Sequence, residues 1–235
     1  ENQHPAGLSA LHSFAELLRR AAISTLEIDS NELHVGLQPT KADNANFRTA
    51  RVFFADSHEN GAGYATALAD PTRLKQLLSD VCDRDGPLLD GMKHRTSCQT
   101  SCPDCLQSYN NRFLHKYFDW RLGLDVAELA TGLKLDEEKR WFSRSDQIIS
   151  VFEKGLGEHI PNLTRGEVEG IPVLRTETNA VLLGHPLWDQ GMNDLNERQS
   201  DALVELEDEV QTVEVSCLFT LDRKPMKIFQ SLLRT

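Results

Sequence analysis

Three cysteines fall within eight residues near the middle of the chain, and this spacing constrains the fold more than any other feature. They are Cys98, Cys102 and Cys105, and His94 stands four residues before the first of them. Thiolate and imidazole groups this close together, with a Pro-Asp turn between the last two cysteines, can converge on one tetrahedral Zn²⁺ ion. We therefore predict a zinc knuckle at C-P-D-C with His94 as the fourth ligand. Because that ligand set leaves no open coordination position, the predicted site is structural and not catalytic.

Other interpretations of this cluster remain open. The cysteines are also compatible with reduced, unliganded thiols in a loop, or with a C-x-x-C redox pair. A redox pair normally follows a strand of a thioredoxin-like unit, and the sequence predicts no such strand upstream. Cys82 competes with His94 for the fourth position. However, Cys82 shares a helical stripe with Leu74, Leu78 and Val81, and a thiol on an apolar stripe is usually part of the core. We predict His94.

The length and composition indicate a globular protein. A chain of 235 residues is expected to form one large or two small domains. Hydrophobic residues make up 40% and charged residues 26%, as in ordinary soluble proteins. No apolar run approaches the length needed to cross a bilayer, and no signal peptide opens the chain, so we expect a cytoplasmic protein without a membrane partner. Residue 1 is Glu, and we expect the chain to be a piece of a longer polypeptide.

The net charge of −11 argues against a surface coated for phosphate binding. The segment after the knuckle is locally more basic, because it contains Arg112, His115, Lys116 and Arg121. Arg112 and Lys116 stand four apart, on one face of a predicted helix. We predict that any contact with DNA is made there, through the backbone phosphates.

Hydrophobic periodicity predicts an α/β (α+β) fold with two domains. The first, residues 1–135, is predicted as a zinc-knuckle module with long helices and a small sheet. Its expected elements are a helix over 9–22, strands over 32–37 and 50–55 with a loop over 38–46, a helix over 71–82, a loop over 83–93 and a helix over 106–130. The second, residues 136–235, is predicted as a smaller mixed α/β domain. Its expected elements are a helix over 136–154, strands over 171–175 and 180–183, a helix over 193–206, a strand over 210–221 and a short helix from 225.

Catalytic motifs are not evident in either half. The turn Gly61-Ala62-Gly63 follows a strand but lacks the G-x-x-x-x-G-K-[ST] pattern of a nucleotide-binding P-loop. Asp56 and Glu59, beside that turn, are expected to cap or to accept hydrogen bonds. A metal-dependent nuclease would need strand carboxylates with a nearby lysine. The second half has several acids near its strands but no acid-x-Lys pair, and His185 is expected to be structural. We predict no catalytic residue.

The sequence from Cys98 to Asp125 resembles a known family. Its pattern, C-x-x-x-C-P-D-C-L-x-x-Y-x-N-x-x-x-H-x-x-x-D-W-R-L-x-L-D, is similar to the MrfA-type zinc-binding domain near the C-terminus of large bacterial superfamily-2 helicases. The upstream stretches L-E-I-D-S-N-E-L-H-V-G-L and F-F-A-D-S-H-E-N-G-A-G-Y agree, so the resemblance covers roughly residues 9 to 131. The D-W-R-L-G-L-D form is similar to that of very large phage-defence helicases. Repair-type members carry cysteine where His94 stands, so His94 as a ligand rests on spacing alone.

This resemblance implies a non-catalytic C-terminal accessory region of an ATP-dependent DNA helicase, in anti-phage defence or DNA repair. Such a region would carry a structural zinc ion, brace the motor and help guide DNA. ATP and Mg²⁺ would bind only to the motor, which lies outside this sequence. The implied partners are DNA, the motor domains and another defence or repair subunit. Two alternatives stay open: a nuclease-like domain fused to a zinc module, and a zinc module that docks other proteins.

Overall fold

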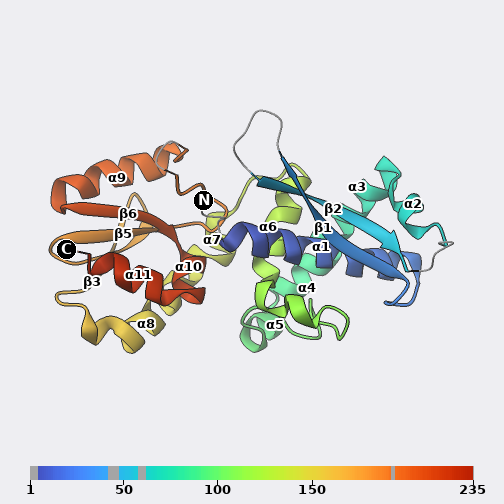
Figure 1. Ribbon diagram of the computed structural model, residues 1–235, viewed down its shortest axis with the longest axis horizontal. Coiled ribbons are helices and arrows are strands. Elements are labelled where there is room, and N and C mark those ends of the chain that lie inside the picture. Colours follow the sequence, from blue (N-terminus) through green and yellow to red (C-terminus); the bar gives the residue numbers. More distant parts are fainter. Residues whose placement is uncertain (1–4, 42–47, 58–61, 192–193, 235) are drawn as a thin grey trace. The chain divides into compact units, whose positions relative to one another are not determined.

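The computed structural model describes residues 5–41, 48–57, 62–191 and 194–234. The chain separates into two compact units, Glu1–Leu135 and Asp136–Thr235, which are described here one at a time. Each unit combines helices with one small sheet (Figure 1), which confirms the predicted mixed α/β class. None of the helices within the described ranges is both long enough and apolar enough to span a membrane.

The first unit contains a long N-terminal helix, a β-hairpin and a series of short helices. Its helices are α1 (Pro5–Leu26), α2 (Tyr64–Leu68), α3 (Pro71–Asp80), the π-helical turn η1 (Val81–Asp85), α4 (Gly86–Asp90), α5 (Met92–Ser97), the 3₁₀ helix η2 (Arg112–Tyr117) and α6 (Trp120–Ala130). Its strands are β1 (Leu33–Lys41) and β2 (Arg48–Asp56), which pair antiparallel. β1 therefore extends into the stretch predicted as a loop, whose remaining residues lie outside the described ranges.

The core of this unit lies where α1 packs on α6. α1 buries small and aliphatic side chains at helical spacing, including Ala15, Leu18 and Ala22. On α6, a Cβ atom added to Gly123 would lie 2.8 Å from Leu17 Cδ1 and 3.0 Å from the Ser13 carbonyl carbon, so only glycine allows the two helices to come this close. The backbone N–H of Asp119 also donates to Ser13 Oγ at 2.8 Å. α1 thus fixes the start of α6.

The segment over 106–130, predicted to be mostly helix, is helical only in two separate parts. The chain instead forms turns, the short η2 helix and an extended residue, and α6 begins only at Trp120. The reason is competition from side chains. Asn111 Oδ1 accepts the backbone N–H of Ser108, and Asn111 Nδ2 donates to the Leu106 carbonyl. These bonds offer the backbone an alternative to the helix. Asp119 then caps α6 through the N–H of Arg121.

The loop predicted over 83–93 is also wrong, because that segment contains the end of η1, all of α4 and the start of α5. Gly86 begins α4, and Gly91 lies between α4 and α5. Because glycine is a poor helix former, the sequence favoured a loop here. Leu89 lies on α4 and is buried in the core. This arrangement brings α5 to the edge of the core.

The second unit is a four-stranded sheet with helices on both faces. Its strands are β3 (Thr164–Val168), β4 (Ile171–Arg175), β5 (Asn179–Gly184) and β6 (Thr212–Cys217). They lie in that order, with β3, β4 and β5 antiparallel and β6 parallel to β5. Its helices are α7 (Glu137–Arg140), η3 (Phe142–Arg144), α8 (Ser145–Leu156), η4 (Gly157–His159), α9 (Glu197–Glu209), α10 (Leu218–Arg223) and α11 (Pro225–Leu232). In Figure 1, α9 covers one face of the sheet, and α8, α10 and α11 cover the other.

The two middle strands are buried along their length, as expected for a sheet covered on both faces. Two predictions for this unit are wrong, and one strand was missed. The helix over 136–154 is interrupted at Trp141, whose fully buried ring packs edge-on against Phe219. The predicted strand over 210–221 ends at Cys217, where α10 begins. β3 was not predicted, because its T-R-G-E-V sequence has no apolar alternation.

Candidate metal centre

His94 and Cys98 are placed by the last turn of α5. The Cys98 N–H donates to the His94 carbonyl at 2.8 Å, so the two residues stand one helical turn apart and their side chains share a face. Cys98 itself has left the helix, with extended backbone angles, and the chain turns there toward the knuckle.

Cys102 and Cys105 form the knuckle itself. The backbone N–H groups of Cys105, Leu106 and Gln107 all donate to the Cys102 carbonyl, at 3.0, 3.1 and 3.0 Å. In the opposite direction, the Cys102 N–H donates to Cys105 Sγ at 3.0 Å. This last bond stabilises negative charge on the sulfur, as a metal-binding thiolate requires. The local sequence therefore prepares both sulfurs for one ion.

The four side chains fit a tetrahedral zinc ion. Their donor atoms all lie within 4.8 Å of one another. Cys98 Sγ and Cys105 Sγ are 3.8 Å apart, and Cys102 Sγ lies 3.6 Å from Cys105 Sγ and 3.6 Å from His94 Nε2. Ligands bound to one tetrahedral zinc at about 2.0–2.3 Å lie about 3.5–3.8 Å apart. A disulfide would bring two sulfurs to about 2.05 Å. The predicted structural zinc site is confirmed.

The orientation of His94 follows from its other ring nitrogen. His94 Nδ1 lies 3.0 Å from the Leu89 carbonyl oxygen. A carbonyl can only accept, so Nδ1 carries the proton and Nε2 offers its lone pair to the metal. Cys82, the competing candidate, is not in the cluster; it lies on η1 and packs against the hydrophobic core.

The site is partly buried: Cys98 and Cys105 lie in the core of the first unit, whereas His94 and Cys102 are partly exposed. Cys98 and Cys105 belong to the same buried cluster as Leu106 and Trp120. Burial, and then the neighbouring thiol of Cys105, raises the pKa of Cys98, and burial raises the pKa of Cys105 to about 11. The metal-free thiols would hold their protons at neutral pH, so zinc binding must release them.

The first turn of α6 holds the loop that carries the ligands. The Trp120 backbone N–H donates to the Thr100 carbonyl at 2.9 Å, and its indole N–H to the Cys98 carbonyl at 3.4 Å. The Trp120 ring packs edge-on against His94, with the ring centroids 5.1 Å apart. Arg121 donates to the Gln99 carbonyl at 2.6 Å and stacks over Trp120. These contacts tie the D-W-R segment to the loop that carries the candidate ligands.

Sequence reasoning missed a further contact with the knuckle. Arg20 on α1 donates to the carbonyls of Pro103 and Asp104, at 3.3 and 2.9 Å. It therefore holds the turn between the last two cysteines. No local signal points to it, because more than eighty residues separate the partners.

Arg112 and Lys116, predicted to contact DNA, are both exposed but do not share a helix face. They lie on η2, a 3₁₀ helix, where residues four apart point about 120° away from each other. The Arg112 guanidinium lies over the Tyr109 and Phe113 rings, 4.5 Å from each centroid, and Lys116 lies over Tyr117. Their contact with DNA stays a prediction.

His115 and Asp56 have structural surroundings. His115 Nε2 lies 3.0 Å from the Ser108 carbonyl and 2.8 Å from Asn111 Oδ1, so it holds the turn before η2. The Asp56 carboxylate accepts the backbone N–H groups of Gly63 and Ala65, at 2.9 and 2.8 Å, and fixes the start of α2. Glu59 and Gly61 lie outside the described ranges.

A comparison with protein families finds a match that includes the candidate zinc site. Residues 14–106 match the MrfA Zn-binding domain. The match lies within the first unit and includes all four ligands. The resemblance stated from the sequence is therefore confirmed for this segment.

A curated relative supports the same assignment. The chain is 30% identical over 123 residues to the Druantia protein DruE of Escherichia coli (strain UMEA 4076-1). The aligned part is 52% of this chain and 6% of that protein, so the chain spans a small part of its relative. No solved structure matches the chain.

Proposed function

We propose that this chain is a non-catalytic accessory region of a DNA helicase in phage defence, and that its zinc module braces the motor and helps guide DNA. The observation that carries the proposal is the complete His-Cys₃ site inside the segment that matches the MrfA Zn-binding domain. The similarity to DruE favours defence over repair. In this proposal the protein acts in the cytoplasm, and ATP and Mg²⁺ bind to the motor.

The construction of the first unit supports a bracing role. α1, the knuckle and α6 are tied together by Arg20, Ser13 and Trp120 through hydrogen bonds between segments far apart in sequence. A module closed in this way presents its surface rigidly to a neighbouring domain. We assign the zinc ion the role of fixing that surface. It takes no part in a reaction, because all four of its positions are filled by protein ligands.

The test of this proposal begins with the longer polypeptide. Its sequence is expected to contain a P-loop lysine and a Mg²⁺-binding acid. In that protein, Cys105→Ser should reduce DNA-stimulated ATP hydrolysis and protection against phage, because one of four ligands is lost. A longer polypeptide without motor motifs would overturn the proposal, as would full unwinding activity in a zinc-free Cys105→Ser protein.

The nuclease alternative finds little support in the second unit. Among the described strands of its sheet, β4 and β5 carry no carboxylate, and the acids are Glu167 on β3 and Glu214 on β6. These are the two edge strands, so about 14 Å separates them at about 4.8 Å per strand spacing. One metal ion cannot bind both. Incubation of the chain with labelled DNA and Mn²⁺ should leave the DNA intact, and cleavage above a mock preparation would favour the nuclease.

The proposed DNA contact is tested by charge reversal. Arg112→Glu together with Lys116→Glu should weaken binding to DNA at low salt, where phosphate contacts are strongest. Zinc content should stay unchanged, since both residues are exposed and outside the ligand set. Equal DNA affinity in the double variant and the parent would place the contact elsewhere.

A further inference from the structure

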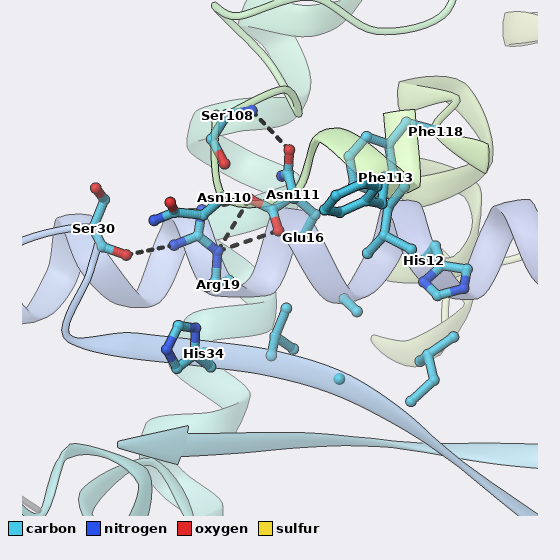
Figure 2. A pocket seen from close by; sticks show the side chains of 15 residues that line it. His12, Glu16, Arg19, Ser30, His34, Ser108, Asn110, Asn111, Phe113 and Phe118 are labelled. Carbon is cyan, nitrogen blue, oxygen red and sulfur yellow. Dashed lines mark hydrogen bonds and ion pairs between the residues drawn. The ribbon is translucent and has the colours of Figure 1, made fainter. Parts of the chain in front are cut away.

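A pocket of about 290 Å³ lies between α1, β1 and the segment that follows the knuckle. In Figure 2, Phe113 and Phe118 lie toward one end of the pocket, and Arg19, Ser30 and Asn110 toward the other. Small-molecule pockets usually measure about 300–1,000 Å³. This pocket is close to the lower end of that range, so its occupant would be one small group, and the lining suits a planar group with an apolar face and a polar edge.

The charges inside the pocket cancel. Glu16 and Arg19 are both buried on α1 and form a salt bridge, with Arg19 Nη2 2.6 Å from Glu16 Oε1. Arg19 Nη1 also donates to the Ser30 carbonyl at 2.9 Å. Burial lowers the pKa of His12, which favours its neutral form. The pocket is therefore better suited to a neutral group than to a phosphate, which would need an uncompensated cation.

One polar atom of a residue that lines the pocket has no partner among the described residues. The Ser108 Oγ is buried and makes no hydrogen bond, although a buried hydroxyl normally has one. The neighbouring Asn111 is not available to it, because its side chain already bonds Ser108 N, Leu106 O and His115 Nε2. An occupant with a hydrogen-bonding edge would satisfy this hydroxyl.

The mouth of the pocket carries exposed aromatic rings around a cation. Phe113, which lines the pocket, is 73% exposed, and Tyr109 is 79% exposed. The Arg112 guanidinium lies between them, 4.5 Å from each ring centroid. Exposed rings held beside an arginine form a surface on which unpaired bases stack and next to which a phosphate is neutralised. A duplex cannot use it, because its bases are already stacked and paired.

We propose that this pocket and the Tyr109–Arg112–Phe113 cluster at its mouth bind an unpaired nucleobase of single-stranded nucleic acid. The base stacks on Phe113 and bonds Ser108 Oγ through its edge, while Arg112 contacts the adjoining phosphate. This inference rests on the proposed function and deepens it. The exposed cations Arg112 and Lys116 specify contact with phosphates alone, whereas the pocket adds a preference for single strands and a contact with a base.

The experiment compares three probes of equal length: a mixed-sequence single strand, the same strand with abasic sites in place of its bases, and the duplex. Binding to the chain is measured by fluorescence anisotropy at low salt. The abasic strand keeps the phosphates but has nothing to stack. The base-containing strand should bind more tightly than the abasic strand by about 5- to 150-fold, the range expected for stacking of one base.

Variants locate the contact. Phe113→Ala should remove the advantage of the base-containing strand and leave abasic and duplex binding unchanged, whereas Phe113→Tyr, which keeps a ring, should retain it. Ser108→Ala should lose about fivefold on the same strand, as for one neutral hydrogen bond. Leu88→Ala is the matched control, since Leu88 is an exposed apolar residue of the same unit that does not line this pocket. Unchanged zinc content and melting temperature verify folding.

The outcomes separate the two claims. Equal affinity for the base-containing and abasic strands overturns this inference but leaves the proposed DNA contact standing. A Phe113→Ala variant that binds all probes as the parent does also overturns it, and would assign the aromatic cluster to a protein partner. No measurable binding to any probe overturns both.

Discussion

The two units bury their interiors by different means. The second unit encloses a four-stranded sheet between two layers of helices, and its middle strands contribute aliphatic residues such as Val181 and Leu182. The first unit has only a two-stranded hairpin and several short helices. An isolated hairpin is marginally stable in water. Part of the core of the first unit consists of Cys98 and Cys105, which are candidate metal ligands.

This difference indicates where stability comes from in each unit. The short segments between α4 and α6 have few regular hydrogen bonds of their own, so the zinc ion and the contacts around it must hold them. The second unit also joins distant segments through buried polar side chains. Asn179, for example, donates to the carbonyls of Leu232 and Arg234 at the C-terminal end. Metal should therefore matter for one unit and hydrophobic packing for the other.

The largest expected effect is that of zinc removal. Structural zinc contributes about 10–16 kcal/mol in small domains, which exceeds the typical total stability of about 5–15 kcal/mol. A strong chelator should abolish the thermal transition of the first unit and leave that of the second within a few degrees, as measured by calorimetry. Added zinc should restore it. If both transitions disappeared together, the units would not be independent in the way we describe.

The next test distinguishes a side chain that binds zinc from one that packs in the core of the first unit. His94→Ala should release most of the zinc, because it removes the Nε2 atom that binds the ion. It also removes Nδ1, whose hydrogen bond to the Leu89 carbonyl orients the ring. Cys82→Ser should retain about one zinc per chain, since Cys82 packs against the core outside the cluster. Elemental analysis of the purified variants provides the measurement. The reverse result, with zinc lost only in Cys82→Ser, would contradict the ligand set.

A substitution that opens a cavity in the second unit should destabilise that unit and leave the zinc site unchanged. Leu182 is fully buried on β5, an inner strand of the sheet. Leu182→Ala should lower the free energy of unfolding of this unit by about 2–5 kcal/mol. Zinc content and the transition of the first unit should not change. Denaturant unfolding followed by elemental analysis checks both, and a loss of zinc here would show coupling between the units.

The smallest effects come from two helical glycines, one in each unit. Gly123→Ala should destabilise the first unit by about 1–3 kcal/mol, because the new methyl group would meet Leu17 and the α1 backbone. Gly155→Ala, on α8, meets no atom within 4 Å and should stabilise the second unit by about 0.5–1 kcal/mol. Opposite shifts in melting temperature are expected. Stabilisation by both substitutions would refute the close α1–α6 approach.

The local part of the candidate site was predictable from the sequence, and so was the mixed fold class. All four candidate ligands lie between His94 and Cys105, so their spacing along the chain already indicates that one turn of α5 and the knuckle can bring them together. The buried stripe on α1 was equally visible, because its apolar side chains recur at helical spacing. Such patterns predict local structure correctly because they depend on residues that are close together along the chain.

Helix boundaries after the knuckle were not predictable in the same way. The stretch from Leu106 to Ala130 has apolar residues at helical spacing, yet Asn111 and Asp119 divert its backbone through side-chain bonds. Propensity cannot decide between a helix and such turns when a tertiary contact, here Ser13 with Asp119, favours the turn. The separation of Arg112 and Lys116 onto different faces follows from this.

The sequence by itself therefore determined which residues gather into the candidate zinc cluster and that the fold is mixed α/β. Only the tertiary structure decided which nitrogen of His94 faces the ion, why Arg20 and Trp120 matter, and that Phe113 and Ser108 share a pocket with α1. The physical reason is sequence separation. Ligand spacing is fixed by a few backbone angles, whereas these other contacts join segments that meet only when the whole core of the first unit has closed.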